Sequence, residues 1–338
     1  MGESTSDGEP LEAATPEASL PRDRRVTLGL IALLIVALGY LVYFSRFEFT
    51  FAGIGALLAV PAAIGGLTSQ LFDPDGEHPP MGCFVWPTLA LVGLVAMAFV
   101  VFDEGAICIA MVLPVWLPAA LAGALVNRWN ARRLARWSRS PERFYSAAWL
   151  VLASLLVLAD EASPPPWETR KVTRSITIAA SPEDIWPLLV AIPAIGGDEG
   201  RATITHDLLA VPRPSDARLV VRDGRLVRQA RWGADIRFEE RIVEWRPNRR
   251  IAWRFAFTDS LVQDHTDRHI SPAGPILRIE DGGYELVPLS SGVTQVRLTT
   301  RYRMRSRLSG YLGWWGERLL GDIEANVLAI VKARAEAR

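Results

Sequence analysis

The segment QDHTDRHISPAG, residues 263–274, holds a dense set of reactive side chains, which includes Asp264, His265, Asp267 and His269. Two imidazoles and two carboxylates within six residues are types that bind a metal ion or transfer protons. Spacing of four residues joins two side chains only on a helix, and Pro272 favours a loop or strand instead. We therefore take His265 and His269 as candidate catalytic residues and expect no metal site.

Two further acid–base candidates, Glu240 and Tyr302, lie in segments with the alternation of strands. Glu240 and Glu244 are in phase with apolar residues, so one carboxylate can face a cavity and have a raised pKa. A β-bulge would turn both outward, and we favour pairing with Arg237 or Arg241 at the surface. No Ser/His/Asp triad, phosphate-binding glycine loop or CxxC motif is evident.

Five predominantly apolar runs fill most of residues 26–160. Four of them approach or exceed the roughly 20 residues with which a helix crosses a hydrocarbon core of about 30 Å. None contains Asp, Glu, Lys, Arg or His, which argues against an ion-coupled pump. We predict an α-helical transmembrane bundle of about five spans over residues 26–160, behind a disordered tail, residues 1–25. The runs are Val26–Phe44, Thr50–Phe72, Phe84–Phe102, Gly105–Val126 and Phe144–Ala159.

Arginines in short connecting segments predict the orientation of the bundle. Arg22, Arg24 and Arg25 precede the first run, and six more lie in residues 127–144, after the fourth run. Both segments should be cytoplasmic, in a bacterial inner (plasma) membrane. If the fifth run crosses, as we favour, the C-terminal half is extracytoplasmic; if it only dips into the bilayer, that half is cytoplasmic.

A second domain, residues 171–338, should follow a stiff Pro-rich linker, residues 161–170. Residues 175–189, SITIAASPEDIWPLL, predict a strand and then a helix capped by Ser181. RLVVRDGRLVRQ predicts a hairpin that turns at Asp223 and Gly224. Further alternating segments predict an antiparallel sheet, and a stripe at helical spacing predicts a long C-terminal helix across its apolar face. The stripe is Leu312, Trp315, Leu319, Ile323, Val327 and Val331.

Several of these segments together resemble the SRPBCC superfamily, and within it the polyketide cyclase/dehydrase and START-like lipid-binding group. They are SITIAASPEDIWPLL, WGADIRFEERIVEWRPNRRIAWRF, GGYELVPLSSGVTQVRLTTRYRMRS and the Trp-rich final helix. The resemblance covers roughly the last half of the chain. It implies an α+β helix-grip fold, an antiparallel sheet wrapped around a long C-terminal helix, with a deep apolar cavity between them. We expect this cavity to be lined by Trp253, Phe255, Phe257, Leu298, Tyr302, Trp314 and Trp315.

These observations favour a membrane-anchored module that binds a lipid or another hydrophobic small molecule, without a cofactor. A polyketide cyclase/dehydratase-like enzyme is the alternative, with His265, His269, Glu240 or Tyr302 as acid or base. A structural or sensory module that binds a partner protein is a further alternative. The formal net charge of zero argues against nucleic-acid binding.

Overall fold

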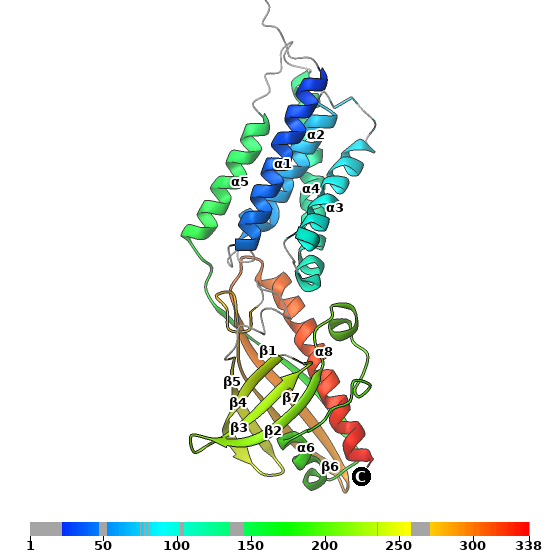
Figure 1. Cartoon of the computed structure of the whole chain (residues 1–338), viewed down its shortest axis with the longest axis vertical. Helices are drawn as coiled ribbons and strands as arrows, with labels where there is room; N and C mark the ends of the chain where they lie inside the picture. Colours follow the sequence, from blue (N-terminus) through cyan, green and yellow to red (C-terminus); the bar gives the residue numbers. More distant parts are fainter. Residues whose placement is uncertain are drawn as a thin grey trace, which may run out of the picture.

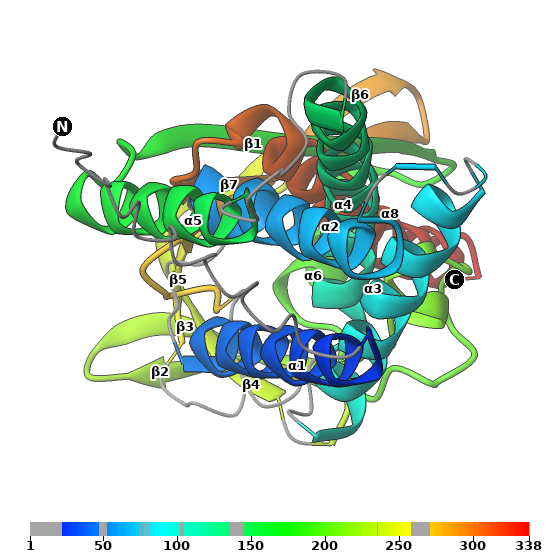
Figure 2. The ribbon, with the colours of Figure 1, turned by 90° about the horizontal axis from the view of Figure 1, so that it is seen from above.

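Two parts make up the chain, a helical bundle at one end and a sheet domain at the other (Figure 1). The computed structural model describes residues 22–46, 53–74, 76–77, 79, 81–101, 105–135, 145–234, 236–257 and 271–337. Seen from the bundle end, the helices lie over the sheet domain (Figure 2).

The bundle has a helix at each of the five apolar runs. They are α1 (Arg22–Arg46), η2 and α2 (Gly55–Ala59 and Val60–Phe72), α3 (Gly82–Val101), α4 (Ala106–Ala135) and α5 (Tyr145–Ala162).

Three of the described helices are long and apolar enough to cross a membrane: Gly55–Phe72, Gly82–Val101 and Ala106–Arg133. The apolar part described for α1, Leu33–Tyr43, is shorter. The structure therefore supports three candidate spans where the sequence predicts about five. Crossing by α1 and α5 stays a prediction.

Glycines bring α2 and α4 into backbone contact. A Cβ atom added at Gly65 would lie 1.9 Å from the carbonyl oxygen of Ala120, and one added at Gly123 would lie 1.9 Å from that of Ala62. Only a hydrogen atom fits at either position. Small residues at such crossings let helices pack closely where no hydrophobic effect drives them together.

Buried charges in the bundle have partners. Arg128 lies 2.5 Å from Asp73, just after α2, and both side chains are 7% exposed. At the end nearer the sheet domain, Asp160 accepts a hydrogen bond of 2.6 Å from the backbone N–H of Gly55. The same carboxylate lies 2.7 Å from Arg307 of the sheet domain, so it ties the two parts of the chain together.

The sheet domain contains one antiparallel sheet of seven strands in the order β1-β7-β6-β5-β4-β3-β2. As predicted, β2 and β3 turn at Asp223 and Gly224, which both have positive φ. A two-residue turn of this kind matches the right-handed twist of the paired strands. The strands are β1 (Glu168–Ile178), β2 (Pro214–Arg222), β3 (Arg225–Trp232), β4 (Ile236–Arg246), β5 (Arg250–Ala256), β6 (Leu277–Ser290) and β7 (Val293–Met304).

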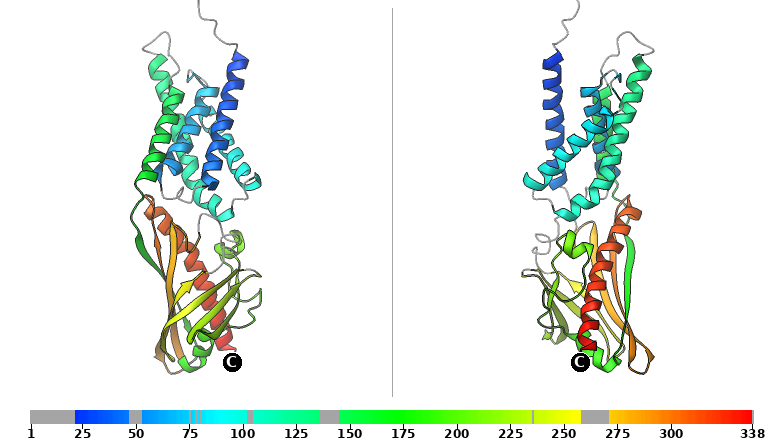
Figure 3. Two further views of the ribbon diagram at one scale, coloured as in Figure 1. Left: turned by 60° about the vertical axis from the view of Figure 1, so that its left-hand side comes forward. Right: turned by 90° about the vertical axis from the view of Figure 1, so that its right-hand side faces the viewer.

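Helix α8 (Ser309–Glu336) begins beside the bundle and ends far from it (Figure 3). It packs on β1 and β7, with α6 (Pro182–Val190) and η3 (Ile204–Leu208) also against it. The Ser181 side chain caps α6, as predicted, by accepting a bond from the Asp184 N–H. An antiparallel sheet with a long C-terminal helix is the arrangement that the resemblance implied.

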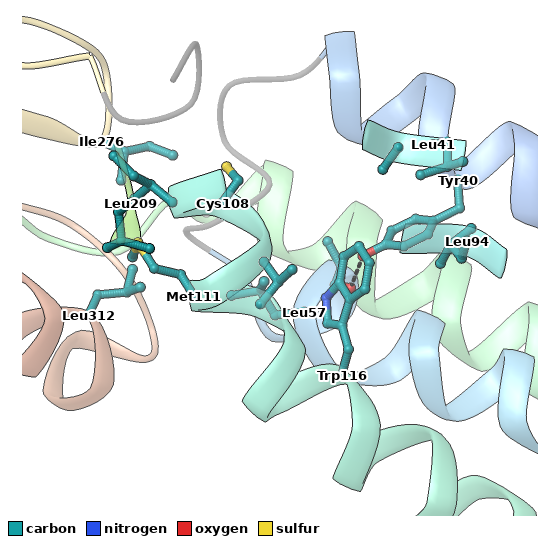
Figure 4. Close-up of a cluster of buried hydrophobic side chains, with 14 of the residues drawn as sticks. Tyr40, Leu41, Leu57, Leu94, Cys108, Met111, Trp116, Leu209, Ile276 and Leu312 are labelled. Carbon is teal, nitrogen blue, oxygen red and sulfur yellow. Dashed lines mark hydrogen bonds between the residues drawn. The ribbon is translucent and has the colours of Figure 1, made fainter. Parts of the chain in front are cut away.

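A continuous apolar cluster joins the bundle to the sheet domain. The Tyr311 hydroxyl donates a 2.6 Å hydrogen bond to the carbonyl of Met111, which fixes the start of α8 against α4. In Figure 4 the side chains of α4 lie between those of the bundle and those of the sheet domain. We call the following buried residues the seam: Ile107, Cys108, Met111, Leu209, Ile276 and Leu312.

Candidate functional site

A cavity of about 260 Å³ lies between the sheet and α8. Most of its wall is apolar and comes from β3 to β7 and from the inner face of α8. Two residues of α4, Ile107 and Met111, complete the wall at the end nearer the bundle. The space exceeds the roughly 150 Å³ of an apolar cavity that binds benzene and falls below the roughly 300–1,000 Å³ of pockets for drug-sized ligands.

Six of the seven residues expected at the cavity line it. They are Trp253, Phe255, Phe257, Leu298, Tyr302 and Trp315. Trp314 departs from the expectation, since it is 59% exposed and is not part of the wall. Successive residues of an α-helix are about 100° apart, because a turn takes about 3.6 residues. The turn that points Trp315 into the cavity therefore points Trp314 out.

Glu240 faces the cavity and does not pair at the surface with Arg237 or Arg241. Its carboxylate lies 2.6 Å from Arg228 of β3, and both side chains are buried. Burial raises the pKa of Glu240, and the Arg228 guanidinium offsets part of that rise. Arg228 also donates a 2.7 Å hydrogen bond to the carbonyl of Leu189. The pair places polar groups in the wall while leaving it without net charge.

A bulge in β4 separates the fates of Glu240 and Glu244. Register shifts between Ile242 and Glu244, so residues beyond it change face. Glu244 consequently pairs outside the cavity with Arg246 and Arg250, at 2.9 and 2.8 Å. The bulge turns one of the two carboxylates outward, whereas the sequence reasoning expected it to turn both.

Glu324 of α8 is the second carboxyl group in the cavity wall, and it is 1% exposed. Burial raises its pKa to about 8. Interactions with Thr300 and Arg174 lower the pKa in part, and Glu317 raises it. Neither carboxylate oxygen has a well-formed hydrogen bond to the described residues. At neutral pH the group is therefore mostly protonated and offers an O–H donor to the cavity.

Trp253 supplies a second donor. Its ring lines the cavity, and its Nε1–H has no acceptor among the described residues. The Arg228 guanidinium lies 5.1 Å from the ring centroid and holds the indole from one face. A buried N–H without a partner costs free energy that a bound acceptor would recover. Both unpaired donors therefore suit a ligand with an oxygen acceptor.

Tyr302, the fourth acid–base candidate, also lines the cavity. Burial raises the pKa of its phenol, so the group is protonated at neutral pH. A Cβ atom added at Gly316 would lie 2.4 Å from the Tyr302 oxygen, so the glycine makes room for the phenol beside α8. Tyr302 is thus positioned to donate or to accept a hydrogen bond.

His265 and His269 lie outside the described residues, together with Asp264 and Asp267. Among the residues that the structure does describe, no group of three His, Cys, Asp or Glu side chains is arranged to hold a metal ion. The remaining described histidine, His206, is buried on η3, and its Nδ1 lies 2.9 Å from the carbonyl oxygen of Val211. Burial lowers its pKa, so it is neutral at pH 7.

Sequence reasoning missed Arg228 and Glu324, although each had a signal. Arg228 alternates in phase with Ala230 and Trp232, so a charge stood on the face of β3 that the pattern marks as buried. Glu324 lies four residues after Leu320 and three before Val327, inside the apolar stripe of α8. A charged residue in phase with a buried face indicates either a paired charge or a group with a shifted pKa.

No protein-family model matches the sequence, and no curated protein matches it either. Solved structures do show similarity. The aromatase/cyclase Zhui from Streptomyces sp. R1128 is 18% identical, with coverage of 51% of this chain and 96% of that chain and a TM-score of 0.32. Truncated norcoclaurine synthase from Thalictrum flavum is 14% identical, with coverage of 52% and 99% and a TM-score of 0.32.

A protein from Thermus thermophilus is 19% identical, with coverage of 50% of this chain and 98% of that chain and a TM-score of 0.30. All these similarities cover about half of the chain. At such TM-scores they assign neither a family nor an activity to it.

Proposed function

We propose that the chain is an integral membrane protein whose sheet domain binds a neutral hydrophobic small molecule in the cavity between the sheet and α8. The observation that carries the proposal is a largely apolar cavity with the buried carboxyl group of Glu324 in its wall. A core built only for stability fills such a space and pairs such a group. The cavity instead offers apolar area and a few oriented donors, as ligand sites do.

Three helices that can cross a membrane support the membrane part of the proposal. The start of α1 and the sheet domain lie at opposite ends of the bundle (Figure 1). With the arginine-rich segments in the cytoplasm, the sheet domain is extracytoplasmic, at the inner membrane of a bacterium. In a Ser290→Cys variant the exposed cysteine should react with a membrane-impermeant maleimide, while Cys83 and Cys108 are buried. Labelling only after cell lysis would show instead that the sheet domain is cytoplasmic.

Mass spectrometry of the purified full chain tests the ligand proposal. We expect a co-purifying neutral molecule or, after its removal, stoichiometric uptake of 1-hexadecanol added in detergent. Trp315→Ala should lower occupancy several-fold, because it removes apolar contact area from the wall. The adjacent exposed Trp314→Ala is the matched control and should bind normally. A cavity that takes up neither a cellular molecule nor the alcohol would contradict the proposal.

Catalysis is a second candidate, favoured by the pKa of about 8 at Glu324. A carboxyl group with a pKa near the working pH serves as a general acid or base, and Tyr302 lines the same cavity. If the protein is an enzyme, a molecule recovered after incubation differs in mass or in structure from the one supplied, and Glu324→Gln stops the conversion while binding persists. A molecule recovered unchanged indicates a binding function.

A further inference from the structure

The bundle end of the cavity is closed by a membrane helix. Ile107 and Met111 of α4 line the cavity there, and they are only 5% and 6% exposed. The same helix is apolar enough to cross a bilayer. On the opposite side of this end lie Leu312 and Trp315 of α8. Figure 4 shows Met111 between the side chains of the sheet domain and those of the bundle. Among the residues that the structure describes, apolar side chains therefore continue from the cavity into the bundle.

The carboxyl groups and the arginine of the cavity wall lie in the part away from the bundle. Leu312 and Glu324 are twelve residues apart on α8, which corresponds to about 18 Å along the helix axis. At the bundle end, the seam residues that line the cavity are apolar, and the polar atoms there are uncharged, namely the Trp315 indole N–H and the Tyr302 hydroxyl. Glu324, Arg228 and Glu240 lie in the other part of the wall. For a molecule that lies lengthwise in the cavity, this arrangement favours a polar group at the Glu324 end and an apolar part towards the bundle.

The end of the cavity far from the bundle, near Glu324, suits a neutral head group. Arg228 is already neutralised by Glu240 at 2.6 Å, so a phosphate or carboxylate would find no free cation in that pair. The other charged groups near Glu324 are Arg174 of β1 and Glu317 of α8, and these two pair with each other at 2.6 Å. What remains at this end are two uncharged donors, the Glu324 carboxyl group and the Trp253 indole N–H, while nearer the bundle the Trp315 indole N–H also has no acceptor among the described residues. A hydroxyl or carbonyl oxygen accepts from both types.

We propose, on the basis of the function proposed above, that the ligand is a neutral membrane lipid with a hydroxyl or carbonyl head. It enters the cavity head first from the bilayer, at the end covered by Ile107 and Met111. Entering this way keeps the tail among apolar side chains and lipid throughout, whereas passage through water would expose its CH₂ groups to solvent. The volume of about 260 Å³ suits the head and part of one chain, with the rest of the tail towards the bundle, and excludes both chains of a phospholipid.

Two photoreactive forms of 1-hexadecanol test the orientation, with a diazirine either next to the hydroxyl or at the tail end. The full chain is reconstituted in phosphatidylcholine vesicles that contain one probe, and labelled peptides are identified after irradiation. The head-proximal probe should label the peptides of Glu324 or Trp253, and the tail probe those of α4. Hexadecyl phosphate with the same diazirines should label the cavity at least tenfold less.

The route is tested by the rate of labelling. Met111→Trp enlarges the side chain at the closed end and should slow labelling from vesicles at least tenfold. Leu113→Trp, two residues along the same helix and 39% exposed, is the matched control and should leave the rate unchanged.

Three results would overturn the inference. They are a reversed labelling pattern, equal labelling by the phosphate, or the same rate in Met111→Trp as in the parent protein. Each of these is distinct from failure of the proposed function. If the proposed function itself is wrong, neither alcohol probe should label the cavity, even when the probe is supplied in detergent.

Discussion

The bundle and the sheet domain both bury carboxyl groups, but they treat them differently. In the bundle, Asp73 lies 2.5 Å from Arg128, and α2 and α4 meet where a glycine of one helix packs against a carbonyl oxygen of the other. In the sheet domain, a cavity of about 260 Å³ remains, and Glu324 projects into it without an ion pair to the described residues. Buried polar groups without a partner cost free energy, so their concentration around one cavity indicates a functional site there.

The Arg228–Glu240 pair combines the two situations, because it is an ion pair like that of the bundle but lies in the cavity wall. Arg228→Met should lower the free energy of unfolding by about 3–5 kcal/mol, since it leaves Glu240 buried and unpaired. Thermal unfolding of the full chain in detergent measures the loss. The double variant with Glu240→Leu should recover most of it, because both charges are then gone. A single variant as stable as the parent would show that the pair contributes nothing.

Glu324 should make stability depend on pH in a direction opposite to that of a salt-bridged carboxylate. Its pKa rises from 4.5 to about 8 on folding, so the folded state holds a proton that the unfolded state has lost. Stability from this group is complete below pH 4.5, falls as pH rises to about 8, and is constant above that, for a total of a few kcal/mol. Glu324→Gln should lack this slope. Parallel stability curves for parent and variant would refute the raised pKa.

The close approach of α2 to α4 predicts that a glycine-to-alanine change lowers stability at the contact between them but not at an uncrowded glycine elsewhere in the bundle. Gly65→Ala places a methyl group against the Ala120 carbonyl and should lower stability by about 1–3 kcal/mol or more. Gly93→Ala is the matched control on α3, where nothing lies within 4 Å of the added carbon. It should be neutral or slightly stabilising, because alanine favours helix over glycine by about 1 kcal/mol. Equal effects of the two changes would remove the contrast between them.

The smallest effect is expected where the two parts meet in solvent. Arg307 is 36% exposed in its ion pair with Asp160, so Arg307→Ala should cost less than about 1 kcal/mol. Asp160→Ala should cost more, because it also leaves the Gly55 N–H without its acceptor. Comparing the thermal unfolding midpoints of the two variants separates these contributions. A larger loss for Arg307→Ala would mean that this ion pair determines how the domain sits on the bundle.

Sequence patterns predicted elements better than they predicted contacts. Alternation and helical stripes placed the strands, the cap at Ser181 and the long α8, because burial repeats with the period of each element. Pattern alone does not show what a residue meets across the sheet. Pairing of Glu240 with Arg228 depends on the register of β3 against β4, and the raised pKa of Glu324 depends on its burial between α8 and the sheet. Trp314 was misplaced because one position on a helix decides between cavity and solvent.

The bulge in β4 has a consequence for how the chain tolerates changes of length. On one side of it Phe238 and Glu240 face inward, and on the other side Trp245 does, with Val243 exposed between them. Loss of Val243 would give a strand with strict alternation in which Phe238, Glu240 and the tryptophan all still face inward. Chains of this architecture that are one residue shorter at this place would therefore keep the same cavity wall.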